Sequence, residues 1–308
     1  MDRRFLVDLV ERLPQGILSR AWGRLSRQRR PRLGIELLKR SFVAATGIDM
    51  SEAAARLEEF ETLEDLFVRR LKPGARRIDP DPVAFVSPVD GRVGAWGKVE
   101  DGTLLQVKGR RYPLERLLAD AEEATRFEGG AYATLYLSPR DYHRIHAPLV
   151  GHVAKATVIP GALLPVFQEA VDSIDELFVR NERLVTYLDN SDAGRVAIVK
   201  VGATLVGRIS VAYDPELHTN VTGQRLRSLT YDPPHLLQKG AELGAFELGS
   251  TVVLLTEADR VRLEGLKPGG LVRMGHRIGT IRERGRSAQR APRGRARRRG
   301  RAEAAGKG

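Results

Sequence analysis

The feature that most constrains the fold of this chain is the texture of residues 84–281, where short apolar runs alternate with glycine and proline. Such runs, rich in β-branched residues, are typical of strands, and glycine and proline at their ends are typical of turns. Examples are GAYATLYL (130–137), GHVAKATVI (151–159), GRVAIVKV (194–201) and STVVLL (250–255). This sequence pattern predicts a mainly antiparallel β core over residues 76–281.

A short internal repeat suggests what kind of core this is. PVDGRV (88–93) and PLVGHV (148–153) share the pattern P-x-x-G-x-V. Proline and glycine at these positions favour tight strand–turn–strand units. Such hairpins resemble those of biotinyl and lipoyl carriers, so we expect a core of the barrel-sandwich or hybrid-motif type.

The sequence pattern of the first 75 residues is typical of helices instead. Between residues 3 and 26, apolar positions that include Phe5, Leu9, Leu18 and Trp22 form one stripe, and arginines lie largely elsewhere. A basic amphipathic helix with an aromatic residue is typical of an interfacial membrane anchor. The alternative is a helix packed on its own domain or on a partner, and the segment alone leaves both open.

Two further helices are predicted, over residues 32–46 and 51–70, with Ser51 as the N-cap of the second. LKPGARRIDPDP (71–82) then reads as a linker. The sequence therefore predicts an α+β protein, with an N-terminal helical, membrane-associating region at 1–75 and a catalytic β core at 76–281.

The net charge of +12 is concentrated at the two ends of the chain. Residues 1–40 hold 11 Lys and Arg against 4 Asp and Glu, and residues 282–308 hold 11 against 2, so the middle is mildly acidic. Basic ends favour a polyanionic partner, either a phospholipid surface or a nucleic acid. Residues 282–308 have no large apolar side chain, and we expect a disordered, Arg-rich tail.

The absence of cysteine excludes a disulfide scaffold, thiol catalysis and Cys-based metal sites, and it fits a reducing compartment. No apolar run approaches the roughly 18 residues of a membrane span. The N-terminus lacks a signal-peptide pattern, because charged residues interrupt it at Asp8, Glu11 and Arg12.

Three short segments contain residues suited to chemistry: Asp90 in SPVDGRVG, the pair His143 and His146, and Gly249-Ser250 before an apolar run. Each has an ordinary explanation. Asp beside Gly is commonly a turn residue, the histidines can be two polar loop residues, and many strands begin after glycine. A histidine pair can also be a fragment of a metal site, but no third or fourth ligand accompanies it, so we expect no metal.

Taken together, these residues supply a carboxylate, an imidazole and a hydroxyl. That set can activate a serine, because the carboxylate orients the imidazole and the imidazole takes the hydroxyl proton. The G-x-S-x-G elbow of many hydrolases is absent. Ser250 instead follows a glycine, which leaves the preceding carbonyl open to attack by the serine oxygen.

Five motifs then resemble one family, the pyruvoyl-dependent phosphatidylserine decarboxylases of the bacterial, membrane-associated LGST type. They are SPVDGRVG (87–94), YLSPRDYHRIHAP (136–148), LFVRNERLV (177–185), VGATLVGRI (201–209) and LGST (248–251). The likeness covers roughly residues 35–281 in consistent order. It implies a zymogen that cleaves itself between Gly249 and Ser250 into a β chain, 1–249, and an α chain, 250–308.

The resemblance also implies a role for each site residue. His146, held by Asp90, deprotonates Ser250, whose oxygen attacks the carbonyl of Gly249. After elimination and hydration, Ser250 becomes a covalent pyruvoyl cofactor, which forms a Schiff base with the serine amine of the lipid. His143 is the family's candidate for assisting decarboxylation and reprotonation.

The implied reaction is the conversion of phosphatidylserine to phosphatidylethanolamine and CO₂ in phospholipid biosynthesis. The implied partners are this lipid and an anionic membrane surface, and the enzyme is an α/β heterodimer that dimerises further. It would lie peripherally on the cytoplasmic side of the cell membrane. One departure is Phe167 in PGALLPVFQEAV, where the family usually has a polar residue near the lipid site.

Two other functions stay open at this point. An Asp/His/Ser hydrolase would act as an intact chain with a free Ser250. A nucleic-acid-binding protein could use the basic ends, although the acidic middle contains no recognisable nucleic-acid motif and no specific nucleic acid is expected.

Overall fold

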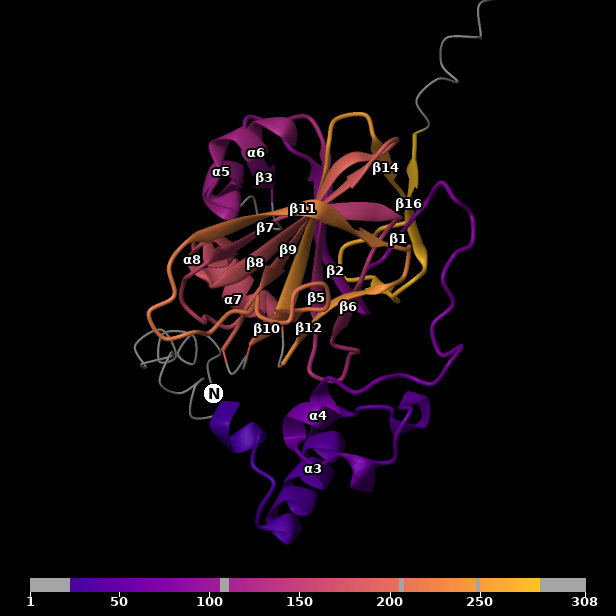
Figure 1. Cartoon of the computed structure of the whole chain (residues 1–308), viewed down its shortest axis with the longest axis vertical. Coiled ribbons are helices and arrows are strands. Elements are labelled where there is room, and N and C mark those ends of the chain that lie inside the picture. The colour runs from indigo at the N-terminus through magenta and orange to yellow at the C-terminus, as the bar shows by residue number, and fades with distance from the viewer. Residues whose placement is uncertain (1–22, 106–110, 205–207, 248–249, 283–308) are drawn as a thin grey trace, which may run out of the picture.

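The structure is a computed structural model that describes residues 23–105, 111–204, 208–247 and 250–282 (Figure 1). Several residues singled out from the sequence therefore lie outside the described residues. These are the predicted membrane-binding residues Phe5, Leu9, Leu18 and Trp22, the cleavage-site residue Gly249, and the tail from residue 283. In the described part of the chain, no helix is both long enough and apolar enough to cross a membrane.

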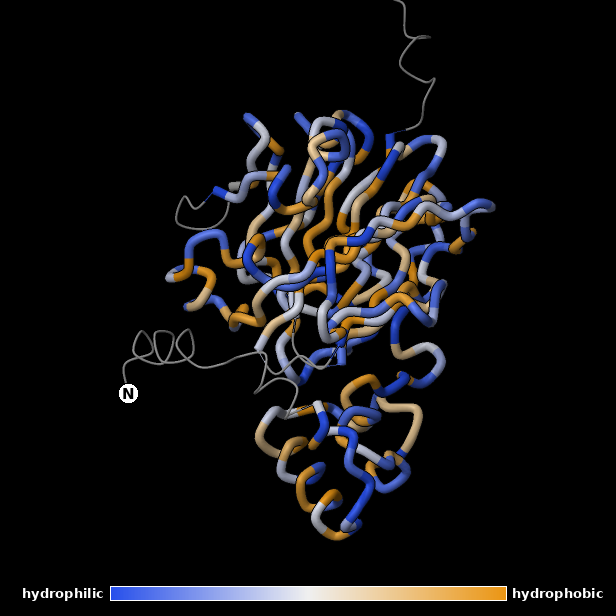
Figure 2. Tube along the Cα trace, turned by 60° about the vertical axis from the view of Figure 1, so that its left-hand side comes forward, coloured by the Kyte–Doolittle hydropathy of each residue, from blue (hydrophilic) through white to orange (hydrophobic). Residues whose placement is uncertain are grey.

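The N-terminal region is helical, and Figures 1 and 2 show it at one end of the β body. Helix α3 spans Arg32–Thr46, as the sequence predicts, and ends because Gly47 takes a left-handed conformation and donates to the carbonyl of Val43. The helix expected over 51–70 is wrong. The segment contains two 3₁₀ turns, Met50–Glu52 and Leu57–Glu59, and only one short α-helix, α4, at Leu63–Phe67.

Long-range backbone contacts explain why that segment is broken. Ala53 forms a bridge with Leu71, and the Ala54 amide donates to the carbonyl of Arg70, so the two ends of the segment are held together. Its caps also differ from the expectation. Asp49, not Ser51, provides the first cap, and the Thr62 side chain caps the amide of Asp65 to start α4.

The main sheet has eight strands in the order β11-β7-β8-β9-β13-β5-β2-β15, and every neighbouring pair is antiparallel. Its strands are β2 (Gly91–Lys98), β5 (Ala131–Leu137), β7 (Gly151–Ile159), β8 (Arg183–Asn190), β9 (Gly194–Val201), β11 (Arg227–Leu237), β13 (Ser250–Thr256) and β15 (Leu271–Val272). The prediction of an α+β fold with a mainly antiparallel core is confirmed. The described strands form no closed barrel, since β11 and β15 are the edges of this sheet.

Three smaller antiparallel sheets and four short helices complete the body. The sheets contain β1 (Ala84–Val86), β16 (Arg277–Ile281) and β14 (Val261–Leu263), then β10 (Ile209–Val211), β12 (Glu242–Phe246) and β6 (Arg144–His146), then β3 (Thr103–Leu105) and β4 (Arg111–Pro113). The helices are α5 (Leu114–Leu118), α6 (Ala121–Arg126), α7 (Gln168–Ser173) and α8 (Leu177–Arg180).

Strand β13 is the best-buried part of the core, because each of its seven residues is buried. Its side chains alternate between the two faces of the sheet, so Val252 and Leu254 join one apolar cluster and Val253 and Leu255 join the other. Apolar residues follow the interior of the β body in Figure 2. Ser250 therefore stands at the start of a strand that packing fixes on both faces.

Candidate active site

Ser250 carries a buried hydroxyl. The residue has no exposed surface, and its Oγ lacks a hydrogen-bond partner among the described residues. Its backbone is opposite Leu137 of β5, and the next residue, Thr251, is also paired with Val201 of β9. Buried hydroxyls are normally satisfied. Since Thr251 Oγ1 also lacks a partner among the described residues, what distinguishes Ser250 is its place directly after Gly249, as the first residue of β13.

The histidine motif lies beside this strand end. The His143 carbonyl accepts a hydrogen bond of 3.0 Å from the amide of Phe246, at the end of β12. Four residues further along the chain, Ser250 pairs with Leu137, which precedes the histidine loop. Two backbone connections therefore close a small ring that carries both His143 and Ser250.

His143 is a buried, neutral base. Its Nδ1 lies 2.9 Å from the carbonyl oxygen of Asp141, and since a carbonyl only accepts, Nδ1 carries the proton. Its Nε2 is then a lone-pair acceptor, and it has no partner among the described residues. Burial lowers the pKa of His143 from 6.5 to about 3, so the ring is uncharged at neutral pH.

His146 has the same tautomer in a different setting. Its Nδ1 donates to the carbonyl oxygen of Gly240 at 2.8 Å, and its Nε2 accepts from the hydroxyl of Tyr142 at 3.2 Å. Burial lowers the pKa of His146 as well, and it raises the pKa of Tyr142 to about 12. At neutral pH, His146 is an uncharged base and Tyr142 keeps its proton.

Asp90 is close to this histidine in the fold, but its hydrogen bonds go elsewhere. The carboxylate accepts from Arg76 Nε at 2.9 and 3.0 Å, and from the amide of Met274 at 2.8 Å. The expectation that Asp90 directly holds His146 is not met in this structure. The described link is through the backbone, where the amide of His146 donates to the carbonyl of Pro88 at 2.8 Å.

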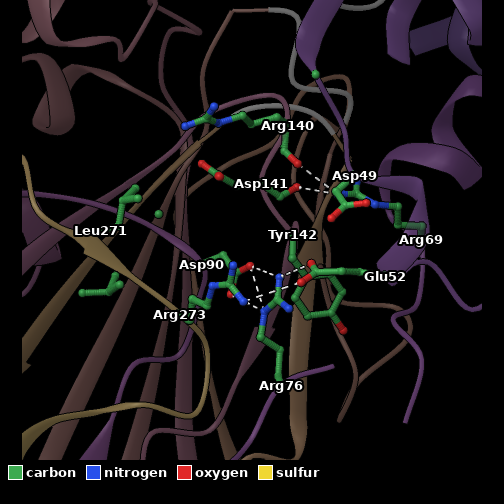
Figure 3. A pocket seen from close by; sticks show the side chains of 13 residues that line it. Asp49, Glu52, Arg69, Arg76, Asp90, Arg140, Asp141, Tyr142, Leu271 and Arg273 are labelled. Atoms are coloured by element: carbon green, nitrogen blue, oxygen red, sulfur yellow. Dashed lines mark hydrogen bonds and ion pairs between the residues drawn. The ribbon is translucent and has the colours of Figure 1, made fainter. Parts of the chain in front are cut away.

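A cavity of about 200 Å³ opens beside Asp90 and Tyr142. Its lining is strongly charged and contains acidic and basic side chains side by side, namely Asp49, Glu52, Asp90 and Asp141 together with Arg69, Arg76, Arg140 and Arg273. Figure 3 shows Arg76 between Asp90 and Glu52 and shows Arg69 directed at the carbonyls of the histidine loop. A polar headgroup with charges of both signs suits such a lining.

Sequence reasoning missed the arginines of this site. Arg69 lies in a stretch expected to be the end of a helix, and Arg76 in a stretch expected to be a linker. Arg69 is buried and bonds to the carbonyl of Arg140, and the side chain of Arg76, 7% exposed, pairs with Asp90. Their only sequence signal is their place between the helical region and the first motif, which is too general to single them out.

The comparisons with known proteins agree with the motifs. Residues 63–280 match the family model described as phosphatidylserine decarboxylase. A phosphatidylserine decarboxylase proenzyme from Anaeromyxobacter sp. (strain K) is 46% identical over 281 residues, covering 91% of this chain and 99% of the relative. The proenzymes of Myxococcus xanthus (strain DK1622) and Brevibacillus brevis are 45% and 40% identical, with 91% of this chain covered in both cases and 100% and 99% of the relatives.

Proposed function

Because the chain belongs to the phosphatidylserine decarboxylase family, we propose that it cleaves itself between Gly249 and Ser250 and then decarboxylates phosphatidylserine. The products are phosphatidylethanolamine and CO₂, and the enzyme depends on a covalent pyruvoyl group. The observation that carries the assignment of position 250 is the unpartnered, buried hydroxyl of Ser250 at the head of β13.

Self-cleavage needs only groups of this chain and one water molecule. A neutral imidazole takes the proton of Ser250 Oγ, and the oxygen attacks the carbonyl carbon of Gly249, which turns the peptide bond into an ester. Loss of the Ser250 α-proton then expels the Gly249 carboxylate. The remaining unsaturated residue takes up water and releases ammonia, which leaves a ketone at the new N-terminus.

His146 is the base that we assign to this first step. The His146 ring is neutral at physiological pH, and its Nε2 lone pair accepts from the Tyr142 hydroxyl, so this hydrogen bond has to open before Nε2 takes the Ser250 proton. Burial is the largest influence on the pKa of His146 and lowers it, the Gly240 hydrogen bond and the Glu242 charge raise it, and the Asp90 carboxylate adds a smaller effect in the same raising direction. Asp90 therefore acts at a distance, while Arg76 and the amide of Met274 hold its carboxylate.

The surroundings of position 250 fit a pyruvoyl group. The Ser250 side chain is buried and has no hydrogen-bond partner in the part of the chain that the structure describes, and β13 is held by β5 on one side and β9 on the other. Once formed, the group supplies an electron sink for the loss of CO₂ from an amino-acid headgroup. His143, with an unpartnered Nε2, is the residue that we assign to moving the proton in this step.

We also propose that the enzyme acts at an anionic membrane surface, on the cytoplasmic side. A two-chain lipid hardly leaves the bilayer, so the site must be brought to it. Helix α3 supports this, because Leu33 and Leu37, one helical turn apart, are 87% and 67% exposed. The predicted stripe at Phe5, Leu9, Leu18 and Trp22 extends the apolar surface along the sequence.

The proposed subunit composition is an α/β heterodimer from one precursor, which then pairs with a second copy. The test of the whole assignment is an intact-mass spectrum of the purified protein. We expect two chains, 1–249 and 250–308, with the smaller one lighter by the mass of ammonia than its encoded sequence. A single chain of full mass that hydrolyses esters would favour the hydrolase alternative instead.

A further inference from the structure

Three consecutive residues of the N-terminal helical region contact the histidine loop. They are Phe67, the last residue of α4, then Val68, and Arg69; we refer to them as the 67–69 segment. The carbonyl of Val68 accepts a hydrogen bond of 2.9 Å from Nε of Arg144, directly after His143. The helical region is therefore joined to the active site itself.

Phe67 packs directly on the ring of His143. The two ring centroids are 4.0 Å apart with planes tilted by 44°, and both side chains are fully buried. Phe67 in turn contacts Phe42 of α3. Contact at this distance limits the rotation of the imidazole about its side-chain bonds.

Arg69 fixes the acceptor that determines the tautomer of His143. Its Nη2 donates to the carbonyls of Arg140 at 2.9 Å and Asp141 at 3.3 Å. The Asp141 carbonyl is also the acceptor of the His143 Nδ1 proton. Because Arg69 and His143 share this oxygen, Arg69 holds it in the place that keeps the proton on Nδ1 and the lone pair on Nε2.

The charge of Arg69 acts in the same direction as its hydrogen bonds. After burial, which is the largest cause, Arg69 also lowers the pKa of His143, whereas the hydrogen bond to Asp141 raises it. The other charged groups that act on Arg69 are Asp90, Arg76, Glu52 and Asp141. The guanidinium therefore opposes protonation of the imidazole at the same time as it orients it.

We propose that Arg69 and Phe67 are positioning residues for His143, so that the helical region completes the active site as well as facing the membrane. The inference rests on the role proposed above for His143. Arg69 does not need to touch the substrate for this role, since it acts through the Asp141 carbonyl.

The decisive experiment observes the His143 ring directly. Full-length protein labelled with ¹⁵N-histidine and carrying Ser250→Ala keeps every sample in one covalent state, and His143→Gln identifies the His143 signals among the six histidines. We expect Nδ1 to be protonated and Nε2 unprotonated in this parent. In Arg69→Met we expect a mixture of tautomers, with protonation beginning at higher pH because a positive charge is lost.

Two matched variants separate the effect of the Arg69 charge from a general disturbance of the structure. Arg70→Met removes the neighbouring, exposed arginine and should leave the His143 signals unchanged. Arg69→Lys keeps the charge but not the forked donor, so it should keep the pH midpoint near that of the parent while the tautomers mix. An unaltered tautomer and midpoint in Arg69→Met, with the protein folded, overturns the inference.

Kinetics on the cleaved enzyme provide a second test. This test can still be made if Arg69→Met does not fold. Phe67→Leu should lower kcat on the order of 10- to 100-fold with little change in KM, because a displaced base harms the chemical step more than binding. A higher KM with an unchanged kcat would contradict the positioning role, because only substrate binding would then be weakened. If His143→Ala decarboxylates at the parent rate, the proposed function of His143 fails, and the NMR result still decides whether Arg69 orients the ring.

Discussion

The amide of Phe246 donates a 3.0 Å hydrogen bond to the carbonyl of His143, which ties the segment before the proposed cleavage site to the loop that carries both candidate bases. The next backbone connection in the ring is the pairing of Ser250 with Leu137. A displacement of either segment therefore displaces the other. His143 and Ser250 are therefore held by hydrogen bonds of the backbone, which substitutions of their side chains leave in place.

Ser250→Ala should abolish self-cleavage completely, because no other atom at this position can attack the preceding carbonyl. A denaturing gel checks this, with one band expected in place of two. The matched control is Thr251→Val, which removes the adjacent buried hydroxyl on the other face of β13 and should cleave normally. Two bands from Ser250→Ala would exclude the proposed mechanism.

The two histidines should fail at different steps. His146→Ala should not cleave, because it lacks the base that takes the Ser250 proton. His143→Ala should cleave but decarboxylate at least about 100-fold more slowly, in the range expected for loss of a general acid–base group. Gel analysis gives the first result and CO₂ release the second, and equal cleavage defects in both variants would argue against this division.

Asp90→Asn should slow self-cleavage and destabilise the fold together. The carboxylate is buried and bonded to Arg76, and removing one partner of a buried pair typically costs about 3–5 kcal/mol. Arg76→Met distinguishes the two effects, since it breaks the same pair but keeps the carboxylate. We expect Arg76→Met to unfold at similarly reduced temperature and yet cleave faster than Asp90→Asn; an equal or lower rate would mean that Asp90 is only structural.

Stability should fall in acid partly because of His143. Its folded pKa is about 3 against 6.5, so between these values the unfolded chain binds a proton that the folded chain excludes. The free energy of unfolding therefore decreases as pH falls through this window, by up to about 1.4 kcal/mol per pH unit from this group. Urea unfolding of the Ser250→Ala protein between pH 6.5 and 4 should show a shallower decline when His143→Gln is added. An unchanged slope would indicate that the ring becomes protonated without unfolding.

Membrane binding should depend on apolar residues more than on the basic tail. Replacing Leu9, Leu18 and Trp22 by Glu should release the protein from anionic vesicles and leave self-cleavage intact. Deleting residues 284–308 should weaken binding only at low salt, because a tail without apolar residues binds by charge alone. Flotation at two ionic strengths tests both statements. Salt-resistant binding by the triple-Glu variant would indicate that the membrane anchor lies in α3 instead. The double variant Leu33→Glu, Leu37→Glu would then test that helix.

Much of the fold could be predicted from local pattern, and the reasons are visible in particular residues. Helix α3 has the expected bounds because Gly47 stops it by a conformation that glycine adopts readily. The β core follows from short runs of apolar and β-branched residues such as STVVLL, which forms β13, a strand with all seven residues buried. The helix predicted over residues 51–70 does not form, because Ala53 pairs with Leu71. Helical periodicity does not detect such a long-range contact.

The site residues could be identified from motifs, but their contacts could not. Asp90 and His146 are obvious as residue types, yet the partner of Asp90 is Arg76, whose sequence context is a linker. The difference between His143, with an unpartnered Nε2, and His146, bonded to Tyr142, depends on burial that only the folded chain creates. The 67–69 segment is the clearest case, since nothing local relates α4 to the histidine loop.

The central place of β13 has a consequence for how the mature enzyme can be handled. After the cut, the smaller chain keeps β13 between β5 and β9, β15 against β2, and β16 against β1, so it stays bound without the peptide bond. The precursor folds as one molecule, whereas the denatured mature enzyme must bring two molecules together before its central strand is in place. Recovery of the mature enzyme from denaturant should therefore depend on protein concentration, and recovery of the uncut Ser250→Ala chain should not.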